Sequence, residues 1–221
     1  MSNTSTVGED VGVFFDGYAE EFDSIYGYNP DRSFFDKIAD RLFRQAMYKR
    51  FQETLSILSD VKIKSVLDVG SGSGRYAVEF LNLNKSVTGI DLAENMIILS
   101  KKIVESKFTK PEATFIHGDY IQHVFDQKFD SAVLMGFFDY IEDATVVLNK
   151  LKKDVPGIIM ASIPKENHFL SYQRKIRYEK RNCPLYLYTY DQLIALLDIC
   201  DFKKYDIIDY GREYFLKIDN R

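Results

Sequence analysis

The chain has 221 residues, of which 46% are hydrophobic and 28% are charged, and its formal net charge is −4. These values suit one domain, or one domain with an appendage, that buries a sizeable core, and they exclude a chain that is mainly disordered. The mild acidity argues against a general nucleic-acid-binding protein.

The two cysteines and the N-terminus bear on cellular location. Cys183 and Cys200 are too few for a disulfide framework, which favours a reducing compartment. Residues 1–10 lack the basic and apolar regions of a signal peptide. No apolar run approaches the roughly 20 residues of a membrane span. We therefore expect a cytoplasmic protein with no membrane span.

The first part of the chain is predicted to form a helical cap. Aromatic residues recur at four-residue spacing over 14–26, which predicts a short amphipathic helix ended by Asn29-Pro30. A second helix is expected over about 33–58. The predicted division is therefore a cap over 1–60 and a second domain over 61–221.

Beyond the cap, short apolar runs alternate with amphipathic helices. This alternation predicts an α/β fold, with a mostly parallel sheet and helices on both faces. Near the end, a hairpin around Gly211 is expected to add an antiparallel edge strand. The expected strands cover 64–69, 86–90, 113–117, 129–135, 157–162, 205–209 and 213–218, and the expected helices cover 73–83, 93–105, 143–152 and 190–199.

A glycine-rich run, Asp68-Val69-Gly70-Ser71-Gly72-Ser73-Gly74, follows the first expected strand and opens a helix. Such a turn lets the backbone approach a ligand closely at a helix N-terminus. Asp91 ends the next strand, at the place where an acid binds ribose hydroxyls in nucleotide-binding sheets.

Three interpretations of this run are open. The segment Gly72-x-Gly74-x-x-Ala77 formally matches the dinucleotide fingerprint, but the carboxylate of Asp68 would repel a pyrophosphate. The same carboxylate would attract the ammonium group of S-adenosylmethionine, which carries a ribose and no phosphate. A glycine turn without a ligand is disfavoured because acids stand at both strand ends. The residues favour S-adenosylmethionine.

Over roughly residues 60–218 the sequence resembles the class I S-adenosylmethionine-dependent methyltransferases. The resemblance is carried by four motifs: the glycine-rich run, Gly89-Ile90-Asp91-Leu92-Ala93-Glu94-Asn95-Met96, His117-Gly118-Asp119-Tyr120 and Phe129-Asp130-Ser131-Ala132-Val133-Leu134-Met135-Gly136. It implies a Rossmann-like seven-stranded sheet, S-adenosyl-L-methionine as cofactor and S-adenosyl-L-homocysteine as product.

The resemblance also implies roles for single residues. Asp68, Gly70, Ser71, Gly72 and Gly74 would hold the methionine part, Asp91 the ribose, Leu92, Met96 and Tyr120 the faces of the adenine, Asp119 its amino group, and Gly136 would lie under the sulfonium. The residues before position 60 are similar to the N-terminal helices of ubiquinone-pathway and magnesium-protoporphyrin O-methyltransferases. On that basis Tyr18 would close over the cofactor, with simple helix packing as the alternative.

Candidate acceptor residues follow the fourth and fifth strands. Asp139 lies at the carboxyl end of the sheet and is the leading candidate for a base, with Tyr140 beside it. The alternative role for Asp139 is an N-cap or loop residue of the helix that begins near Asp143. His168 is a further catalytic candidate, in the insert where members of the family place acceptor contacts.

The insert at 164–188 is both basic and aromatic. Its arginines, among them Arg174 and Arg177, would share one helix face, either as a solvated surface or as a lid for an anionic acceptor. Tyr186 and Tyr188 then return an aromatic segment toward the sheet.

We expect a methyltransferase acting on a small molecule, with oxygen preferred over nitrogen or carbon as the acceptor atom. The alternatives are an RNA or protein methyltransferase that uses the basic insert, and a regulatory module that binds the cofactor without catalysis. No His, Cys and Asp cluster has metal-ligand spacing, so a metal is not expected.

Overall fold

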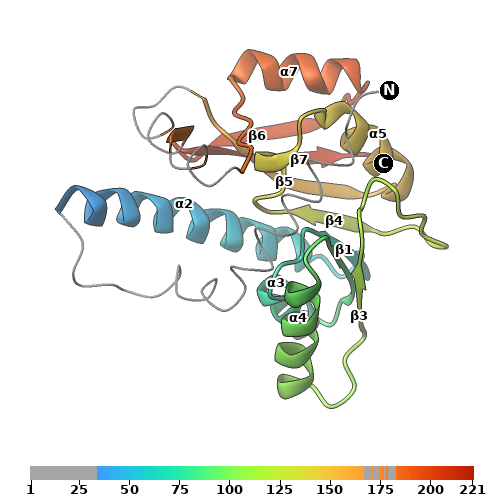
Figure 1. Cartoon of the computed structure of the whole chain (residues 1–221). Coiled ribbons are helices and arrows are strands. Elements are labelled where there is room, and N and C mark those ends of the chain that lie inside the picture. The colour runs from blue at the N-terminus through green and yellow to red at the C-terminus, as the bar shows by residue number, and fades with distance from the viewer. Residues whose placement is uncertain (1–33, 167–170, 172–174, 177, 179–182) are drawn as a thin grey trace.

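The computed structural model describes residues 34–166, 171, 175, 176, 178 and 183–221, with only the backbone described for 34–44. Its centre is a seven-stranded sheet in the order β3-β2-β1-β4-β5-β7-β6 (Figure 1). The strands are β1 (Ser65–Val69), β2 (Ser86–Asp91), β3 (Ala113–His117), β4 (Ser131–Leu134), β5 (Ile158–Pro164), β6 (Tyr205–Asp209) and β7 (Glu213–Asp219).

The predicted α/β fold class is confirmed. Strands β1 to β5 pair in parallel, and β7 pairs antiparallel with both β5 and β6. The antiparallel strand is therefore placed between β5 and β6, one position in from the edge. Strand order reverses between β1 and β4, and the crevice at the carboxyl ends of these two strands is where open α/β sheets bind ligands.

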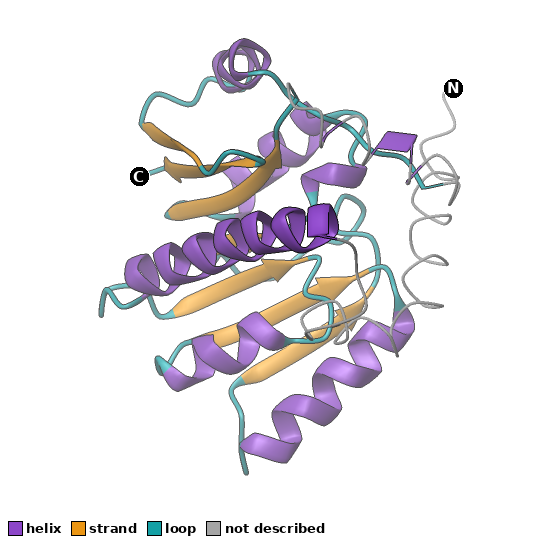
Figure 2. Cartoon of the chain, turned by 90° about the vertical axis from the view of Figure 1, so that its left-hand side faces the viewer, coloured by secondary structure: helices purple, strands orange, loops and turns teal. Residues whose placement is uncertain are grey.

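Helices cover both faces of the sheet (Figure 2). Apolar side chains of α2, α3 and α4 join one buried cluster, and those of α5 and α7 join a second cluster on the opposite face. Residues of β5 alternate between them, with Met160 in the first and Ile159 in the second. The helices are α2 (Phe34–Leu58), α3 (Arg75–Asn82), α4 (Glu94–Lys107), η2 (Phe138–Tyr140, a 3₁₀ helix), α5 (Ala144–Asp154) and α7 (Tyr190–Ile199).

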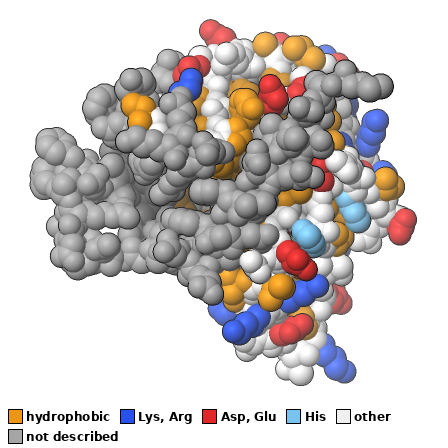
Figure 3. Space-filling view, viewed as in Figure 1, with side chains coloured by type: hydrophobic (Ala, Val, Ile, Leu, Met, Phe, Trp, Pro, Cys, Tyr) orange, Lys and Arg blue, Asp and Glu red, His pale blue; other side chains and the backbone are white. Residues whose placement is uncertain are grey.

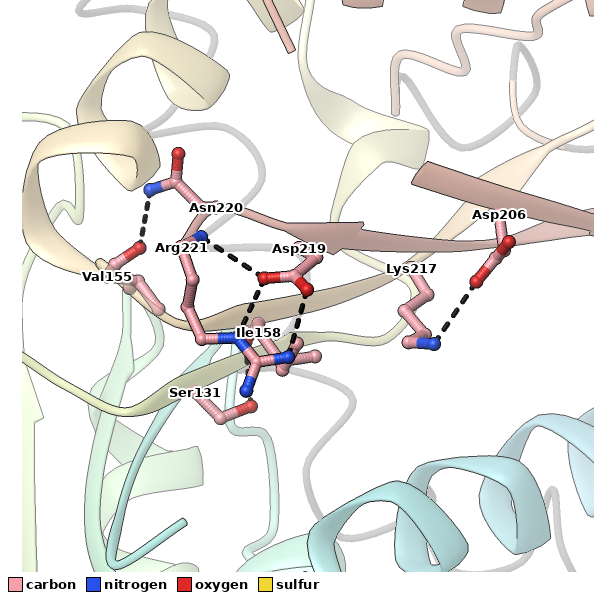
Figure 4. A network of polar contacts seen from close by, with 8 residues as sticks. All are labelled: Ser131, Val155, Ile158, Asp206, Lys217, Asp219, Asn220 and Arg221. Carbon is pink, nitrogen blue, oxygen red and sulfur yellow. Dashed lines mark hydrogen bonds and ion pairs between the residues drawn. The ribbon is translucent and has the colours of Figure 1, made fainter. Parts of the chain in front are cut away.

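The end of the chain is fixed at the amino ends of the parallel strands (Figure 4). The Asn220 side chain donates to the carbonyl of Val155 at 2.7 Å and to that of Lys152 at 3.0 Å. Beside it, the Arg221 guanidinium binds the Asp219 carboxylate at 2.8 Å. These contacts tie β7 to the loop between α5 and β5, far from the carboxyl ends where the candidate site lies.

Helix α2 confirms the second predicted helix of the cap. Leu58 is fully buried in the cluster that also contains Ala77 and Phe80, and the ring of Phe51 packs edge-on against Tyr76 at 5.2 Å. The helix predicted over 14–26 lies outside the described residues. No described helix is both long and apolar enough to traverse a lipid bilayer.

Candidate functional site

The glycine-rich loop between β1 and α3 has a backbone that only glycine adopts easily. Gly70, Gly72 and Gly74 have φ angles of 70°, 51° and 77°. A Cβ on Gly74 would lie 2.8 Å from the Cβ of Ser100 in α4, and one on Gly70 would lie 3.1 Å from the ring of Phe137. The loop is therefore held against α4 on one side and against the segment after β4 on the other.

Asp91 at the end of β2 organises the same loop. Its Oδ2 accepts a hydrogen bond from the backbone N–H of Gly72 at 2.8 Å, and its Oδ1 accepts one from Ala93 at 2.9 Å. A carboxylate has acceptor capacity beyond these two bonds, so it can also receive hydroxyl groups. The structure thus brings Asp91 to the glycine-rich loop, as the sequence predicted, and its contact with a ribose stays a prediction.

Asp68 lies beneath this loop and is 3% exposed. Burial raises its pKa to about 7, and the negative charge of Asp91 contributes to the rise. Within the described part of the chain, Asp68 Oδ2 and the hydroxyls of Ser71 and Ser73 are buried without a hydrogen-bond partner. Such orphan groups are costly unless a ligand completes them, so the loop fits a ligand with an ammonium and hydroxyl groups.

The residues predicted to surround the adenine follow β2 and β3. His117 Nε2 lies 3.0 Å from the carbonyl oxygen of Leu92 and holds this turn in place, which is a structural role. Met96 is buried in the first turn of α4. Asp119 is half-buried, and its Oδ1 accepts a hydrogen bond from the backbone of Ile121 at 2.8 Å.

Tyr120 lies deeper than the predicted role suggests. It is 2% exposed, its hydroxyl donates to Asp154 at 3.2 Å, and Lys150 Nζ lies 4.9 Å from its ring centre. These contacts make it a core residue that anchors α5. Its contact with an adenine stays a prediction.

The segment after β4 forms the second half of the site. Gly136 has a φ of 78° and its N–H donates to Ser162 Oγ in β5 at 2.8 Å. Asp139 lies in η2 and is 5% exposed, and a Cβ on Gly136 would lie 3.8 Å from its Oδ2. The N-cap role considered for Asp139 is wrong, because the Asp143 side chain caps α5 by accepting from Thr145 N at 2.9 Å.

The segment 183–188 packs on η2. Tyr186 N donates to the carbonyl oxygen of Asp139 at 2.9 Å, and Tyr188 N donates to that of Pro164 at 2.9 Å. Burial, with the charges of Asp139 and Asp143, raises the pKa of Tyr188 to about 12, so its hydroxyl remains protonated. The structure therefore brings the predicted residues Tyr186 and Tyr188 to Asp139.

Tyr140 also faces an aromatic partner. Its hydroxyl lies 3.4 Å from that of Tyr178, and their ring centres are 6.2 Å apart.

On the face seen in Figure 3, hydrophobic side chains gather in the upper half with acidic ones beside them, whereas most Lys and Arg side chains lie at the periphery.

Four predicted site residues, Tyr18, His168, Arg174 and Arg177, lie outside the described residues. Two described residues of this region were missed by the sequence reasoning, namely Phe137, which covers Gly70, and Ser162, which binds Gly136. A signal for Ser162 existed, since it is a polar residue inside the apolar run of β5. In the described ranges, no three His, Cys, Asp or Glu side chains come together as a metal-binding group.

Comparisons with known proteins agree with this geometry. Residues 66–153 match the family model of a methyltransferase domain. The ubiquinone biosynthesis O-methyltransferase of Hydrogenovibrio crunogenus is 25% identical over 106 residues, which are 48% of this chain and 44% of that protein. The malonyl-[acyl-carrier protein] O-methyltransferase of Bacillus cytotoxicus is 27% identical over 177 residues, or 76% and 58% of the two chains. The chain thus spans about half the length of these relatives.

Among solved structures, magnesium protoporphyrin IX methyltransferase from Synechocystis PCC 6803 with bound S-adenosylhomocysteine has a TM-score of 0.74 and 16% identity, covering 96% of this chain and 98% of that one. That likeness concerns the fold. The strand order and this likeness show the class I methyltransferase fold, and residues 66–153 match a methyltransferase domain, a family whose cofactor is S-adenosylmethionine.

Proposed function

We propose that this protein transfers a methyl group from S-adenosylmethionine to a small-molecule acceptor, with an oxygen as the preferred acceptor atom. One observation carries the proposal: the segment after β4, which bears the buried Asp139, packs directly on the glycine-rich loop through Phe137 and Gly70. A donor held by the loop and an acceptor held beside Asp139 would therefore be neighbours.

The chain's own residues define the donor side. Asp68 would receive the ammonium group, and Asp91 would receive the ribose hydroxyls. When bound, S-adenosylmethionine supplies a methyl group on an electrophilic sulfonium. The loop then fixes the direction from which an acceptor must approach, and this orientation is the main contribution of the enzyme to such a displacement.

Asp139 would act on the acceptor. A hydroxyl becomes a better nucleophile when a carboxylate takes its proton as the bond forms. Asp139 is buried, which strengthens its interaction with a bound hydroxyl compared with the same pair in water. Tyr188 keeps its proton, which it donates to the carbonyl oxygen of Ile141 at 3.4 Å, so it would contribute its ring to the acceptor side.

The acceptor class is also part of the proposal. The relatives are named for a ubiquinone pathway and for a malonyl group on an acyl carrier protein, and this supports a methyl transfer to oxygen. Tyr186 and Tyr188 would wall the acceptor pocket, and Arg174 and Arg177 would receive an anionic group on it. Cys183 and Cys200 are free thiols, which supports a cytoplasmic location.

The test uses labelled S-adenosylmethionine with a metabolite extract, and Asp139→Asn as the decisive variant. We expect the wild-type chain to label a small molecule, and Asp139→Asn to slow labelling by about 10²–10⁴-fold while S-adenosylhomocysteine binds with unchanged affinity in calorimetry. The exposed Asp126→Asn serves as the matched control. Equal rates for wild type and Asp139→Asn would exclude Asp139 as the base. Label on RNA or protein only, or cofactor binding without any turnover, would favour the alternative functions.

A further inference from the structure

Arg50 is a buried arginine in α2, 8% exposed as a whole residue. Its Nη1 donates to Glu213 Oε2 at 2.7 Å and to Ser162 Oγ at 3.3 Å. Glu213 begins β7 and Ser162 lies near the carboxyl end of β5, so one guanidinium joins α2 to two strands that are more than 100 residues away in sequence. The two side chains of the ion pair are only 10% and 13% exposed.

A buried ion pair is an expensive way to attach a helix to a sheet, because two charges lose their hydration. Helix α2 already has apolar attachments, in Leu58 and in the Phe51–Tyr76 contact, that carry no such cost. The position of the Arg50–Glu213 ion pair therefore points to a role other than attaching the helix. It lies at the carboxyl ends of the parallel strands, on the side where the candidate site is built.

Ser162 connects the pair to that site. Its Oγ accepts hydrogen bonds both from Arg50 and from the N–H of Gly136, the latter at 2.8 Å. Gly136 has a left-handed backbone and opens the segment that ends in η2 with Asp139. A serine hydroxyl that is fixed by a guanidinium has little freedom to rotate away, so the position of the Gly136 peptide depends on Arg50.

We propose that Arg50 and Ser162 are positioning residues for methyl transfer. Arg50, held by Glu213, fixes Ser162, and Ser162 fixes the Gly136 peptide and with it the approach of Asp139 to the donor. Helix α2, which belongs to the predicted cap, would thereby set the geometry of a site that it does not itself form. This inference rests on the proposed function, because only a methyl-transfer site gives the Gly136 peptide its importance.

The chain offers close controls for both residues. Ser131 is equally buried, on the neighbouring strand β4, but its hydroxyl donates to the carbonyl of Ile158 at 2.8 Å near the opposite end of the sheet. Lys85 is a buried cation, 4% exposed, whose Nζ donates to the carbonyls of Asp60 and Ile63 at the amino ends of the strands. Ser131→Ala and Lys85→Met should lower overall stability without touching the network.

The experiment compares Ser162→Ala and Arg50→Met with these two controls. Amide hydrogen exchange of the ¹⁵N-labelled, ligand-free protein is followed at Gly136 and at Val133 in the middle of β4, and S-adenosylhomocysteine affinity is measured by calorimetry. We expect both test variants to speed exchange at Gly136 at least tenfold relative to Val133, and to weaken S-adenosylhomocysteine binding at least threefold. The controls should change both amides alike and leave affinity unchanged.

Conservative variants distinguish a specific effect on Gly136 from a general loss of folding. Ser162→Thr retains a hydroxyl, and Arg50→Lys retains a cation opposite Glu213, so each should recover part of the protection at Gly136. The inference is overturned if Gly136 and Val133 respond equally in the test variants, or if affinity does not change. A wild-type chain that binds no S-adenosylhomocysteine would refute the proposed function instead, and the exchange data would still report whether Arg50 and Ser162 hold Gly136.

Discussion

The carboxyl group of Asp68 is placed where folding alone would not place it. It is buried in β1, next to the charge of Asp91, and within the described residues its Oδ2 has no hydrogen-bond partner. Desolvation without compensation destabilises the ionised form, and the raised pKa expresses this cost. A buried carboxylate without a hydrogen-bond partner fits a site that a ligand completes, and the ammonium group of the cofactor would complete it.

Asp68 should make the ligand-free protein less stable as pH rises. Its folded-state pKa of about 7 exceeds the ordinary value of 3.8, so the folded chain binds the proton more tightly than the unfolded chain does. The stabilising effect of that proton is fully present below about pH 4 and is lost as pH rises to about 7, with a total of at most about 4 kcal/mol. Urea unfolding at pH 5, 6, 7 and 8 measures it. Asp68→Asn should flatten the dependence, and the same slope in both proteins would contradict this account.

Cofactor binding should show the opposite pH dependence. If the ionised form of Asp68 receives the ammonium group, the competent fraction of the protein is about one tenth at pH 6 and nearly complete at pH 8. The affinity for S-adenosylhomocysteine should therefore be about tenfold higher at pH 8. Calorimetry in two buffers of different ionisation enthalpy should also detect proton release near pH 6.5. A pH-independent affinity would remove Asp68 from the binding site.

Where the local sequence signal is strong, the predicted bounds of an element agree with those in the structure. Helix α7 begins at Tyr190 because Thr189 and Gln192 form a reciprocal capping box, which is readable from residue types alone. Strand β4 begins later than predicted, because the N–H of Phe129 donates to the carbonyl of Asp154, the last residue of α5, rather than to a neighbouring strand. That partner depends on the packing of α5 and could not be read locally.

The candidate site likewise combines contacts that the sequence predicts with contacts that depend on packing between distant segments. Adjacent parallel strands place Asp68, the glycine-rich loop and Asp91 together, and the order of strand, turn and helix along the chain already implies this. The contact of Arg50 with Ser162 spans 112 residues and depends on how α2 lies across the sheet and on the register of β5 with β7. No local pattern encodes that register, so sequence reasoning did not find the pair.

The junction between α3 and α4 depends on Gly74. Its φ is 77°, and a Cβ at this position would lie 2.8 Å from the Cβ of Ser100, so any side chain is strained there. Gly74→Ala should lower the free energy of unfolding by about 1–3 kcal/mol. Ser100→Gly is itself destabilising, because it puts a glycine inside α4 and removes the hydrogen bond from Ser100 Oγ to the carbonyl of Ile97. The double variant Gly74→Ala/Ser100→Gly should nevertheless lose less stability than the sum of the two single variants, since it removes the 2.8 Å contact. A double-mutant cycle in urea measures the coupling, and purely additive effects would show that the two positions are not in contact.

At the scale of the whole molecule, the predicted boundary between a cap over 1–60 and a domain over 61–221 runs through a shared core. Leu58 is fully buried with Ala77 and Phe80, and Leu55 packs against the same cluster. Arg50 adds a polar attachment to β5 and β7. The part of α2 whose side chains are described is thus packed onto one face of the sheet (Figure 2).

Removal of residues 1–60 should therefore not leave an intact methyltransferase domain. Loss of one fully buried leucine costs about 2–5 kcal/mol, and the truncation removes Leu58 together with the buried Ala46 and the Phe51–Tyr76 contact. Because domains of this size are stable by only about 5–15 kcal/mol, the truncated chain should aggregate or unfold at much lower urea concentration than the full chain. Leu58→Ala provides a graded comparison, with an intermediate urea midpoint by circular dichroism. A truncated chain with the wild-type midpoint and intact S-adenosylhomocysteine binding would show that residues 61–221 fold alone, and it would also contradict the positioning role proposed for Arg50.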